Sequence, residues 1–270
     1  MVDIAKLKLP SVSRECSKIL EMLGKEEATA QKIAKVASLD PMLSTCLIRY
    51  ANSPLYRRAT DVASVSAAIN VLGLRNVTAA VMMVTMRSLA KNPAPIDEKI
   101  WQHCIAISTL AKVVAAKACP GNAEEVELAG MLHDIGALVL ATNFPAEYAE
   151  LERESLMQQT PMDVLEQAKF GVSRSELSRL VAKEFRLPVR VAQLLEAYHE
   201  PGAAHANDKC LAAIALAHWI EQEQIPLQER LLETIPIAQE SARLCLGFSQ
   251  EVIVEISSQA QALLQERFAF

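Results

Sequence analysis

A histidine and an aspartate, His133 and Asp134, stand side by side in the apolar stretch GMLHDIGALVL at residues 130–140. Imidazole nitrogens and carboxylate oxygens both bind divalent metal ions, and a bound ion can activate water to hydrolyse a phosphate ester. Successive residues of a helix point about 100° apart. Both side chains could therefore reach one ion only at a helix end or in a distorted turn, which Gly136 makes plausible.

Further ligands must come from elsewhere in the chain, because a divalent ion needs more than two. The other histidines are His103, His199, His205 and His218. His103 and His218 each lie among apolar residues in the middle of an expected helix. A histidine in that setting is more often a hydrogen-bonded core side chain than a ligand. Spacing alone leaves both interpretations open.

The elements that must position these residues are helices. Apolar residues recur at helical spacing near both ends of the chain, period-2 strand patterns are missing, and only 8 glycines serve 270 residues. We therefore predict an all-α fold. Capping residues and Gly or Pro breaks predict helices from Ser11 or Ser13 to Gly24, and over about 29–38, 41–52, 64–72, 74–90, 97–118, 123–142, 144–157, 161–169, 173–185, 188–199, 207–224, 227–246 and 249–267.

The composition excludes several classes of protein. Apolar residues make up 51% of the chain and the net charge is −5, which favours a large core and gives no general attraction to nucleic acid or an anionic membrane. The first ten residues lack the apolar run of a signal peptide, and the longest apolar runs, 79–86 and 211–220, fall short of the ~20 residues of a membrane helix. Six scattered cysteines without a CxxC pair indicate buried, reduced thiols. We predict a cytoplasmic protein that binds no membrane.

Nucleic-acid binding is a weaker hypothesis. Residues 29–52 superficially suggest a helix-turn-helix, but the second helix offers one arginine and is mostly apolar. A recognition helix needs several polar or basic side chains. We interpret this segment as core and predict no nucleic-acid partner.

The segment HEPGAAHAND at residues 199–208 is the best candidate for an internal boundary. We predict one domain over residues 1–222 and a C-terminal helical extension over residues 223–270, packed on the same domain. A separate C-terminal domain is the alternative. The sequence leaves open whether the extension caps the fold, forms a homo-oligomer or binds a partner.

The stretch AGMLHDIGALVL resembles the signature of the HD superfamily, all-α proteins whose founding members are metal-dependent phosphohydrolases. Further segments, within residues 7–222, are similar in order to those of the HDOD (HD-related output domain) family. These segments are LPSVSRECSKILEML, IAKVASLDPMLSTCLIRYANSPLY, VASVSAAINVLGLRNV, IWQHCIAISTLAK and EFRLPVRVAQLLEAYHEPG. The resemblance implies a single multi-helix HD-like domain.

The resemblance also implies a set of metal ligands. Catalytic HD proteins surround a metal with a first histidine, the His-Asp pair and a distant aspartate. The corresponding residues here are His103, His133, Asp134 and His218, so a histidine replaces the distant aspartate. Histidine still binds zinc and other transition metals, but the lost carboxylate disfavours Mg²⁺. We predict a vestigial site with no cofactor, or with a divalent transition metal as the alternative.

Two other differences from the pattern of catalytic relatives argue against hydrolytic activity. Ala137 stands where related cyclic-diguanylate hydrolases carry a lysine, and the GYP segment of those enzymes is missing. Arg174 stands where many relatives have a histidine, and a guanidinium does not ligate metals. We therefore predict no catalytic residue. In a structural role, Asp134 would accept hydrogen bonds from backbone N–H groups of the next helical segment, and His133 would bond a carbonyl or a carboxylate.

The resemblance implies a bacterial, non-catalytic signal-transduction module that acts through contacts with other signalling proteins. The loop NSPLYRRATD, with Tyr56, Arg57 and Arg58, is a candidate contact surface, because Tyr and Arg are frequent in binding hot spots. An ordinary solvated loop is the alternative for this segment. The alternative function is a metal-dependent phosphohydrolase acting on a nucleotide or cyclic dinucleotide, with the four candidate ligands holding the ion.

Overall fold

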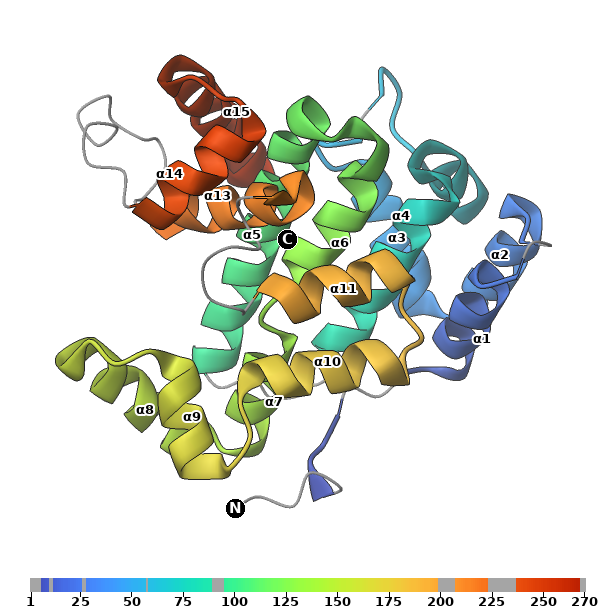
Figure 1. The fold of residues 1–270 in the computed structure, drawn as a ribbon. Coiled ribbons are helices and arrows are strands. Elements are labelled where there is room, and N and C mark those ends of the chain that lie inside the picture. The colour runs from blue at the N-terminus through green and yellow to red at the C-terminus, as the bar shows by residue number, and fades with distance from the viewer. Residues whose placement is uncertain are drawn as a thin grey trace.

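The computed structural model describes residues 6–9, 12–25, 28–56, 58–88, 95–198, 207–222 and 237–267. No strand occurs within these ranges, which confirms the all-α prediction. Figure 1 shows the helices gathered around a central pair, α5 (Pro95–Ala118) and α6 (Ala123–Leu132).

The first helices begin close to the positions that the sequence predicts. They are α1 (Arg14–Leu23), α2 (Ala30–Ala37), α3 (Pro41–Ala51) and α4 (Val65–Arg87). The side chains of Ser13, Thr29 and Asp40 accept hydrogen bonds from backbone N–H groups in the first turns of α1 to α3. These N–H groups have no partner inside the helix, so each cap stabilises a helix start.

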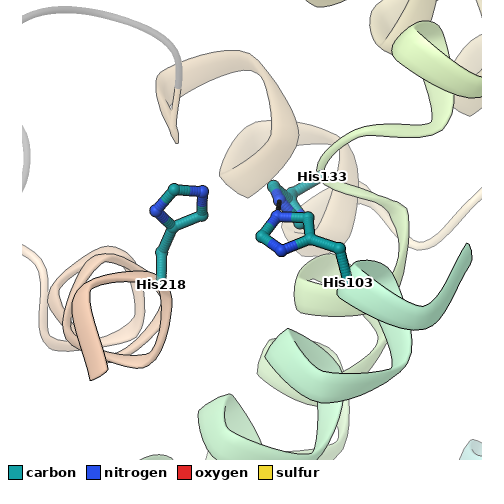
Figure 2. A group of neighbouring side chains, drawn as sticks. All are labelled: His103, His133 and His218. Carbon is teal, nitrogen blue, oxygen red and sulfur yellow. Dashed lines mark hydrogen bonds between the residues drawn. The ribbon is translucent and has the colours of Figure 1, made fainter. Parts of the chain in front are cut away.

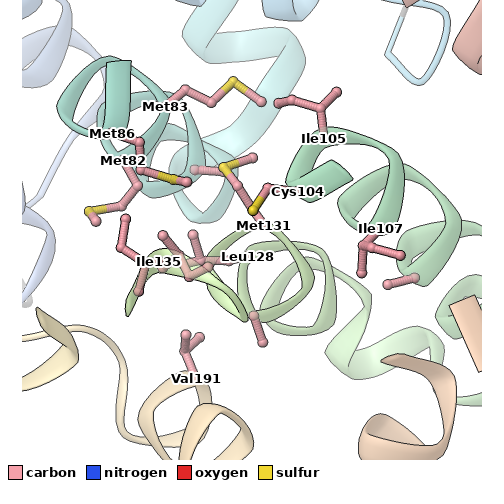
Figure 3. Packing of buried hydrophobic residues seen from close by; sticks show 14 of the residues in the cluster. Met82, Met83, Met86, Cys104, Ile105, Ile107, Leu128, Met131, Ile135 and Val191 are labelled. Atoms are coloured by element: carbon pink, nitrogen blue, oxygen red, sulfur yellow. The ribbon is translucent and has the colours of Figure 1, made fainter. Parts of the chain in front are cut away.

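Helix α4 is kinked at Gly73, where separate helices were predicted to meet. The φ angle of Gly73 is 74°, a value that glycine adopts without the clash of a Cβ atom. By length and composition alone α4 could cross a membrane, but 61% of its most apolar window is buried inside the protein. Figure 3 shows Met82 and Met86 of α4 in the core. The cytoplasmic location stays a prediction.

Helix α6 lies at the centre of the core. It packs against α4, α5, α11 (Val189–Tyr198) and α13 (Lys209–Gln222), and its residues from Val126 to Leu132 are buried. Gly130 allows α6 to approach α5 closely, since a Cβ atom there would lie 3.1 Å from the Cβ of Ala111. This close crossing brings the C-terminal end of α6 next to α5.

The single helix predicted over residues 123–142 is wrong. Two helices, α6 and α7 (Ile135–Asn143), meet at His133 and Asp134. Residues 128–132 of α6 and 135–141 of α7 are apolar at every position, so hydrophobic periodicity gives no signal for the break. The break lets the two neighbouring polar side chains enter different surroundings.

The remaining helices before the boundary segment cover one side of α7 and α6. They are α8 (Pro145–Gln158), α9 (Met162–Phe170), α10 (Arg174–Glu184) and α11. Helix α10 packs between α7 and α11. Ser173 and Glu176 form a reciprocal capping box at its start, which fixes Arg174 as the first helical residue.

The last helices pack on the core helices. Helix α14 (Ile237–Leu246) contacts α13, and α15 (Gln250–Arg267) contacts α5. The first part of the helix predicted over 227–246 lies outside the described residues. The division of the chain at residue 222 stays a prediction.

Gly136 serves another purpose than the turn expected for it, because it lies inside α7. A Cβ atom at Gly136 would lie 2.0 Å from the carbonyl oxygen of Arg174, so only glycine allows the backbone of α10 to come this near. We predict that Gly136→Ala lowers the free energy of unfolding by about 1–3 kcal/mol or more, measured by chemical denaturation. Gly121→Ala is the matched control, because nothing lies within 4 Å of a Cβ atom there. Equal stability of the two variants would contradict this role.

Candidate metal centre

Three of the four predicted ligands come together at the end of α6. His103 of α5, His133 after α6 and His218 of α13 each offer a ring nitrogen, and these atoms lie within 4.8 Å of one another. Figure 2 shows the rings of His103 and His133 in contact and the ring of His218 reaching from α13 toward the same space. We refer to these residues as the histidine group. The group is formed by the packing of α6, α5 and α13.

His133 is buried, and its two ring nitrogens have different partners. Nδ1 lies 2.8 Å from the carbonyl oxygen of Gly130. A carbonyl only accepts, so Nδ1 carries the proton in this contact. Mainly through burial, the pKa of His133 is lowered to about 3. The ring is therefore neutral at pH 7, and Nε2 carries a lone pair. The carbonyl bond of His133 agrees with the structural role expected for it.

His103 supplies the second nitrogen. Its Nδ1 lies 3.2 Å from Oε2 of Glu221, and its Nε2 lies 3.1 Å from Nε2 of His133. Burial opposes ionisation of Glu221, but the bond with His103 helps to lower the pKa of that carboxyl group. A carboxylate only accepts, so Nδ1 of His103 carries a proton. The two Nε2 atoms therefore face each other at hydrogen-bond distance.

His218 completes the group. Its ring centroid lies 5.0 Å from that of His103 and 5.7 Å from that of His133. Burial and the neighbouring His103 lower the pKa of His218 to about 4. Neutral imidazole is the form that binds metal ions, so the buried ring of His133 and the half-buried ring of His218 are ready to act as ligands at pH 7.

Two members of the histidine group have the spacing of ligands to one transition-metal ion. Two nitrogens bound to zinc at about 2.0–2.1 Å in a tetrahedron lie about 3.3 Å apart, close to the 3.1 Å between the Nε2 atoms of His103 and His133. The Gly130 carbonyl and the Glu221 carboxylate bind the opposite ring nitrogens, an arrangement that orients histidine ligands. His103, His133 and His218 would hold the ion, which would act as a Lewis acid.

Asp134, the fourth predicted ligand, lies beside the histidine group but is bound by Arg174. Nη1 of Arg174 donates to Oδ2 of Asp134 at 3.1 Å, and the same oxygen lies 3.8 Å from Nε2 of His133. The side chain of Asp134 makes no capping bond to α7, so the helix-capping role expected for it is wrong. Its carboxylate is held by a guanidinium from a helix 40 residues further along the chain.

Arg174 is itself fixed by a second carboxylate and a tyrosine. Its Nε donates to Oε1 of Glu166 at 2.9 Å and its Nη2 to the hydroxyl of Tyr148 at 2.9 Å. The backbone N–H of Arg174 donates to Oε2 of Glu166 at 2.8 Å. Burial disfavours the charged guanidinium, but Asp134, Tyr148 and Glu166 raise the pKa of Arg174 above its ordinary value. We call Arg174 with these three partners the arginine clamp.

A second polar cluster lies on the same two central helices. The hydroxyl groups of Tyr50 and Tyr56 each lie 2.6 Å from a carboxylate oxygen of Glu127, and Lys112 of α5 lies 2.5 Å from that carboxylate. The phenol of Tyr56 thus anchors its loop to α6. The tyrosine is a poor candidate for a contact side chain, while Arg58 is exposed. Arg57 lies outside the described residues.

One further residue of this site could have been predicted from the sequence. Glu221 follows His218 by three residues, which places both on one face of α13, and this signal was not used. Glu166 and Tyr148 gave no signal, because nothing local links them to Arg174.

The helical fold, with a His-Asp pair at a break between two central helices, defines an HD-like domain. The family model of the HDOD domain matches residues 9–201, and the chain belongs to this family.

Solved structures share the fold. An HDOD domain protein with unknown function from Geobacter sulfurreducens is 22% identical with a TM-score of 0.74, over 97% of this chain and 93% of that one. A candidate phosphohydrolase from Shewanella amazonensis is 18% identical with a TM-score of 0.71, over 96% and 94%. A candidate signal transduction protein from Marinobacter aquaeolei is 21% identical with a TM-score of 0.68, over 97% and 58%. Identities this low show the fold alone.

A curated relative extends well beyond the matched part. An uncharacterized protein of Treponema pallidum is 22% identical over 213 residues, which cover 78% of this chain and 41% of that protein.

Arg174→Ala removes the cation from the arginine clamp and leaves the carboxylates of Asp134 and Glu166 buried without it. Breaking a buried ion pair from one side costs roughly 3–5 kcal/mol, so we predict a loss of unfolding free energy of that size in urea denaturation. The control is Arg179→Ala on the same helix, whose side chain is 50% exposed and pairs with Glu196 at 3.6 Å. An exposed pair contributes about 0–1 kcal/mol. Similar losses in both variants would show that the clamp is not structural.

Proposed function

We propose that the protein is a non-catalytic regulatory module of signal transduction that acts through contacts with other proteins. The observation that carries the proposal is the bond from Arg174 to Asp134. It holds the one carboxylate of the predicted ligand set and links it to a buried network of structural bonds. The family and its signal-transduction and phosphohydrolase neighbours agree with either a regulatory or a hydrolytic role. The choice between these two roles therefore rests on the residues of the site.

The features of the site argue against hydrolysis. A metal-dependent phosphohydrolase needs groups that bind the ion, activate water and neutralise phosphate charge. Arg174 is a cation that could bind phosphate, but its donors are directed at Asp134, Glu166 and Tyr148. Ala137 is buried within α7. Within the described residues one group of three potential metal ligands is found, which does not offer the ligands of a two-metal site.

Hydrolysis assays test this proposal. We expect no metal-dependent turnover of nucleotides, cyclic dinucleotides or an activated phosphodiester in the presence of Mg²⁺, Mn²⁺ or Zn²⁺. His133→Ala is the background control, and the two proteins should give equal rates. Turnover by the native protein that disappears in His133→Ala would overturn the proposal. A partner captured equally by both proteins would support a role in protein contacts that is independent of the histidine group.

A second candidate function is metal binding without turnover, which the geometry of the histidine group favours. The three nitrogens suit zinc or a similar ion, whereas Mg²⁺ prefers oxygen ligands. Metal bound to the folded state alone stabilises it by about 2.7 kcal/mol at a hundredfold excess over Kd. This role is compatible with regulation, because an ion would join α5, α6 and α13.

Titration with metals tests the second candidate. We expect one equivalent of Zn²⁺ per chain by elemental analysis and a raised Tm, with no effect of Mg²⁺. His218→Ala should lose the bound metal, while Glu221→Gln should keep it with an affinity lowered about 10–100-fold. Native-like circular dichroism confirms that each variant folds. Equal metal content in native protein and His218→Ala would exclude the histidine group as the binding site.

A further inference from the structure

Two cysteines that are far apart in the sequence meet at the end of α5. Cys119 follows α5 directly, and Cys210 lies in the first turn of α13. Their sulfur atoms are 3.7 Å apart, although 91 positions separate them in the chain. The six cysteines are scattered along the sequence without a CxxC pair, so the sequence did not predict this contact.

The other cysteines differ from this pair. Cys16 and Cys104 are buried, and burial raises the pKa of both thiols. Cys46 bonds the carbonyl oxygen of Ala80 at 3.7 Å. Among the cysteines, all of which lie in described ranges, Cys119 and Cys210 make the one sulfur–sulfur contact that the structure shows.

The surroundings of Cys210 favour its thiolate. Asp208 caps α13 and accepts from the backbone N–H of Cys210 at 2.9 Å, so the thiol lies at the positive end of the helix. Arg190 of α11 pairs with Asp208 at 2.6 Å, which offsets the negative charge of that carboxylate. The bond with the Cys119 thiol, followed by Arg190, lowers the pKa of Cys210 to about 7 against the effect of burial. The same contact raises the pKa of Cys119.

A thiolate next to a protonated thiol is the arrangement that forms a disulfide after oxidation. Cys119 is half-buried, whereas Cys210 is buried with 4% of its surface exposed. A disulfide has an S–S length of about 2.05 Å, so the sulfurs must approach by about 1.7 Å. Both residues are at helix ends, where small backbone shifts cost less than inside a helix.

We propose that Cys119 and Cys210 form a reversible disulfide when the protein meets hydrogen peroxide. The Cys210 thiolate attacks one peroxide oxygen; the O–O bond breaks, a sulfenic acid forms, and hydroxide leaves and takes up a proton. The Cys119 thiol then attacks the sulfenic sulfur; the S–S bond forms, the S–O bond breaks, and water leaves with the Cys119 proton. Two thiols are oxidised by two electrons, and one peroxide is reduced to two waters.

The disulfide would join the end of α5 to the start of α13. These helices carry His103 and the residues His218 and Glu221, so the oxidised bond would fix the relative position of two sides of the histidine group. Closing a loop of this length stabilises the folded state relative to the unfolded chain. We expect Tm to rise by about 5–10 °C on oxidation.

Thiol mapping on the full chain tests the proposal. Reduced protein is exposed to a small excess of hydrogen peroxide, alkylated and digested. We expect a linked peptide pair containing Cys119 and Cys210, 2 Da lighter than the two thiol peptides and separated again by dithiothreitol. The raised Tm should return to the reduced value with it. Two thiols still free to alkylate in the folded protein, or Cys210 linked to Cys245, would overturn the proposal.

Single substitutions separate the two cysteines. In Cys119→Ser, the sulfenic acid on Cys210 should persist and react with dimedone, because the resolving thiol is missing. Cys46→Ser is the matched control and should form the disulfide like the native protein. A disulfide-linked peptide or a rise in Tm that persists in Cys119→Ser would contradict the assignment. The mapping of the native protein remains decisive if a variant fails to fold.

Discussion

The bond between Arg174 and Asp134 is the constraint on which the arrangement of this domain depends. A buried guanidinium is tolerated only when its charge and its donors are satisfied, and here the partners come from three different helices or their ends: Asp134 before α7, Tyr148 in α8 and Glu166 in α9. Satisfying them requires α10 to lie against α7, and Gly136 makes that contact possible by leaving room for the Arg174 carbonyl. Gly136 of HDIG and Arg174, 38 positions later, are therefore both needed for the contact between α7 and α10.

The same constraint determines the chemistry left at the histidine group. With Asp134 turned toward Arg174, the remaining donors are imidazoles, and burial keeps His133 and His218 neutral. The carboxylate of Asp134 lies 3.8 Å from Nε2 of His133, but its bond with Arg174 disfavours a role as general base or as ligand of a hard cation. The other nearby carboxylate, Glu221, bonds the far nitrogen of His103 and so orients a ring instead of binding at the centre. Three imidazole ligands suit a soft ion better than a hard one.

Local chemistry explains how far the fold could be predicted from the sequence. The starts of α1, α2 and α3 were correct because Ser13, Thr29 and Asp40 act within a few residues of themselves. The break at His133 was missed because α6 and α7 are buried all round and carry no periodic pattern. The clamp was missed for a different reason: Arg174 was recognised as a residue that cannot ligate metal, but its partners are chosen by the packing of α8, α9 and α10. Sequence spacing carries no information about such long-range pairs, and the meeting of Cys119 with Cys210 is another case.

Helices α5 and α13 connect the polar sites of the domain. Helix α5 carries His103 and Lys112 and is followed by Cys119, while α13 carries Cys210 near its start and His218 and Glu221 near its end. Eight residues of helix separate Cys210 from His218, about 12 Å along the axis. A helix of this length moves as a rigid body, so a bond formed at one end restricts the other. An ion between the imidazoles and a disulfide at the helix start would both act on the contact between α5 and α13. The relative position of α5 and α13 is therefore the property that the bound ion and the disulfide would both fix.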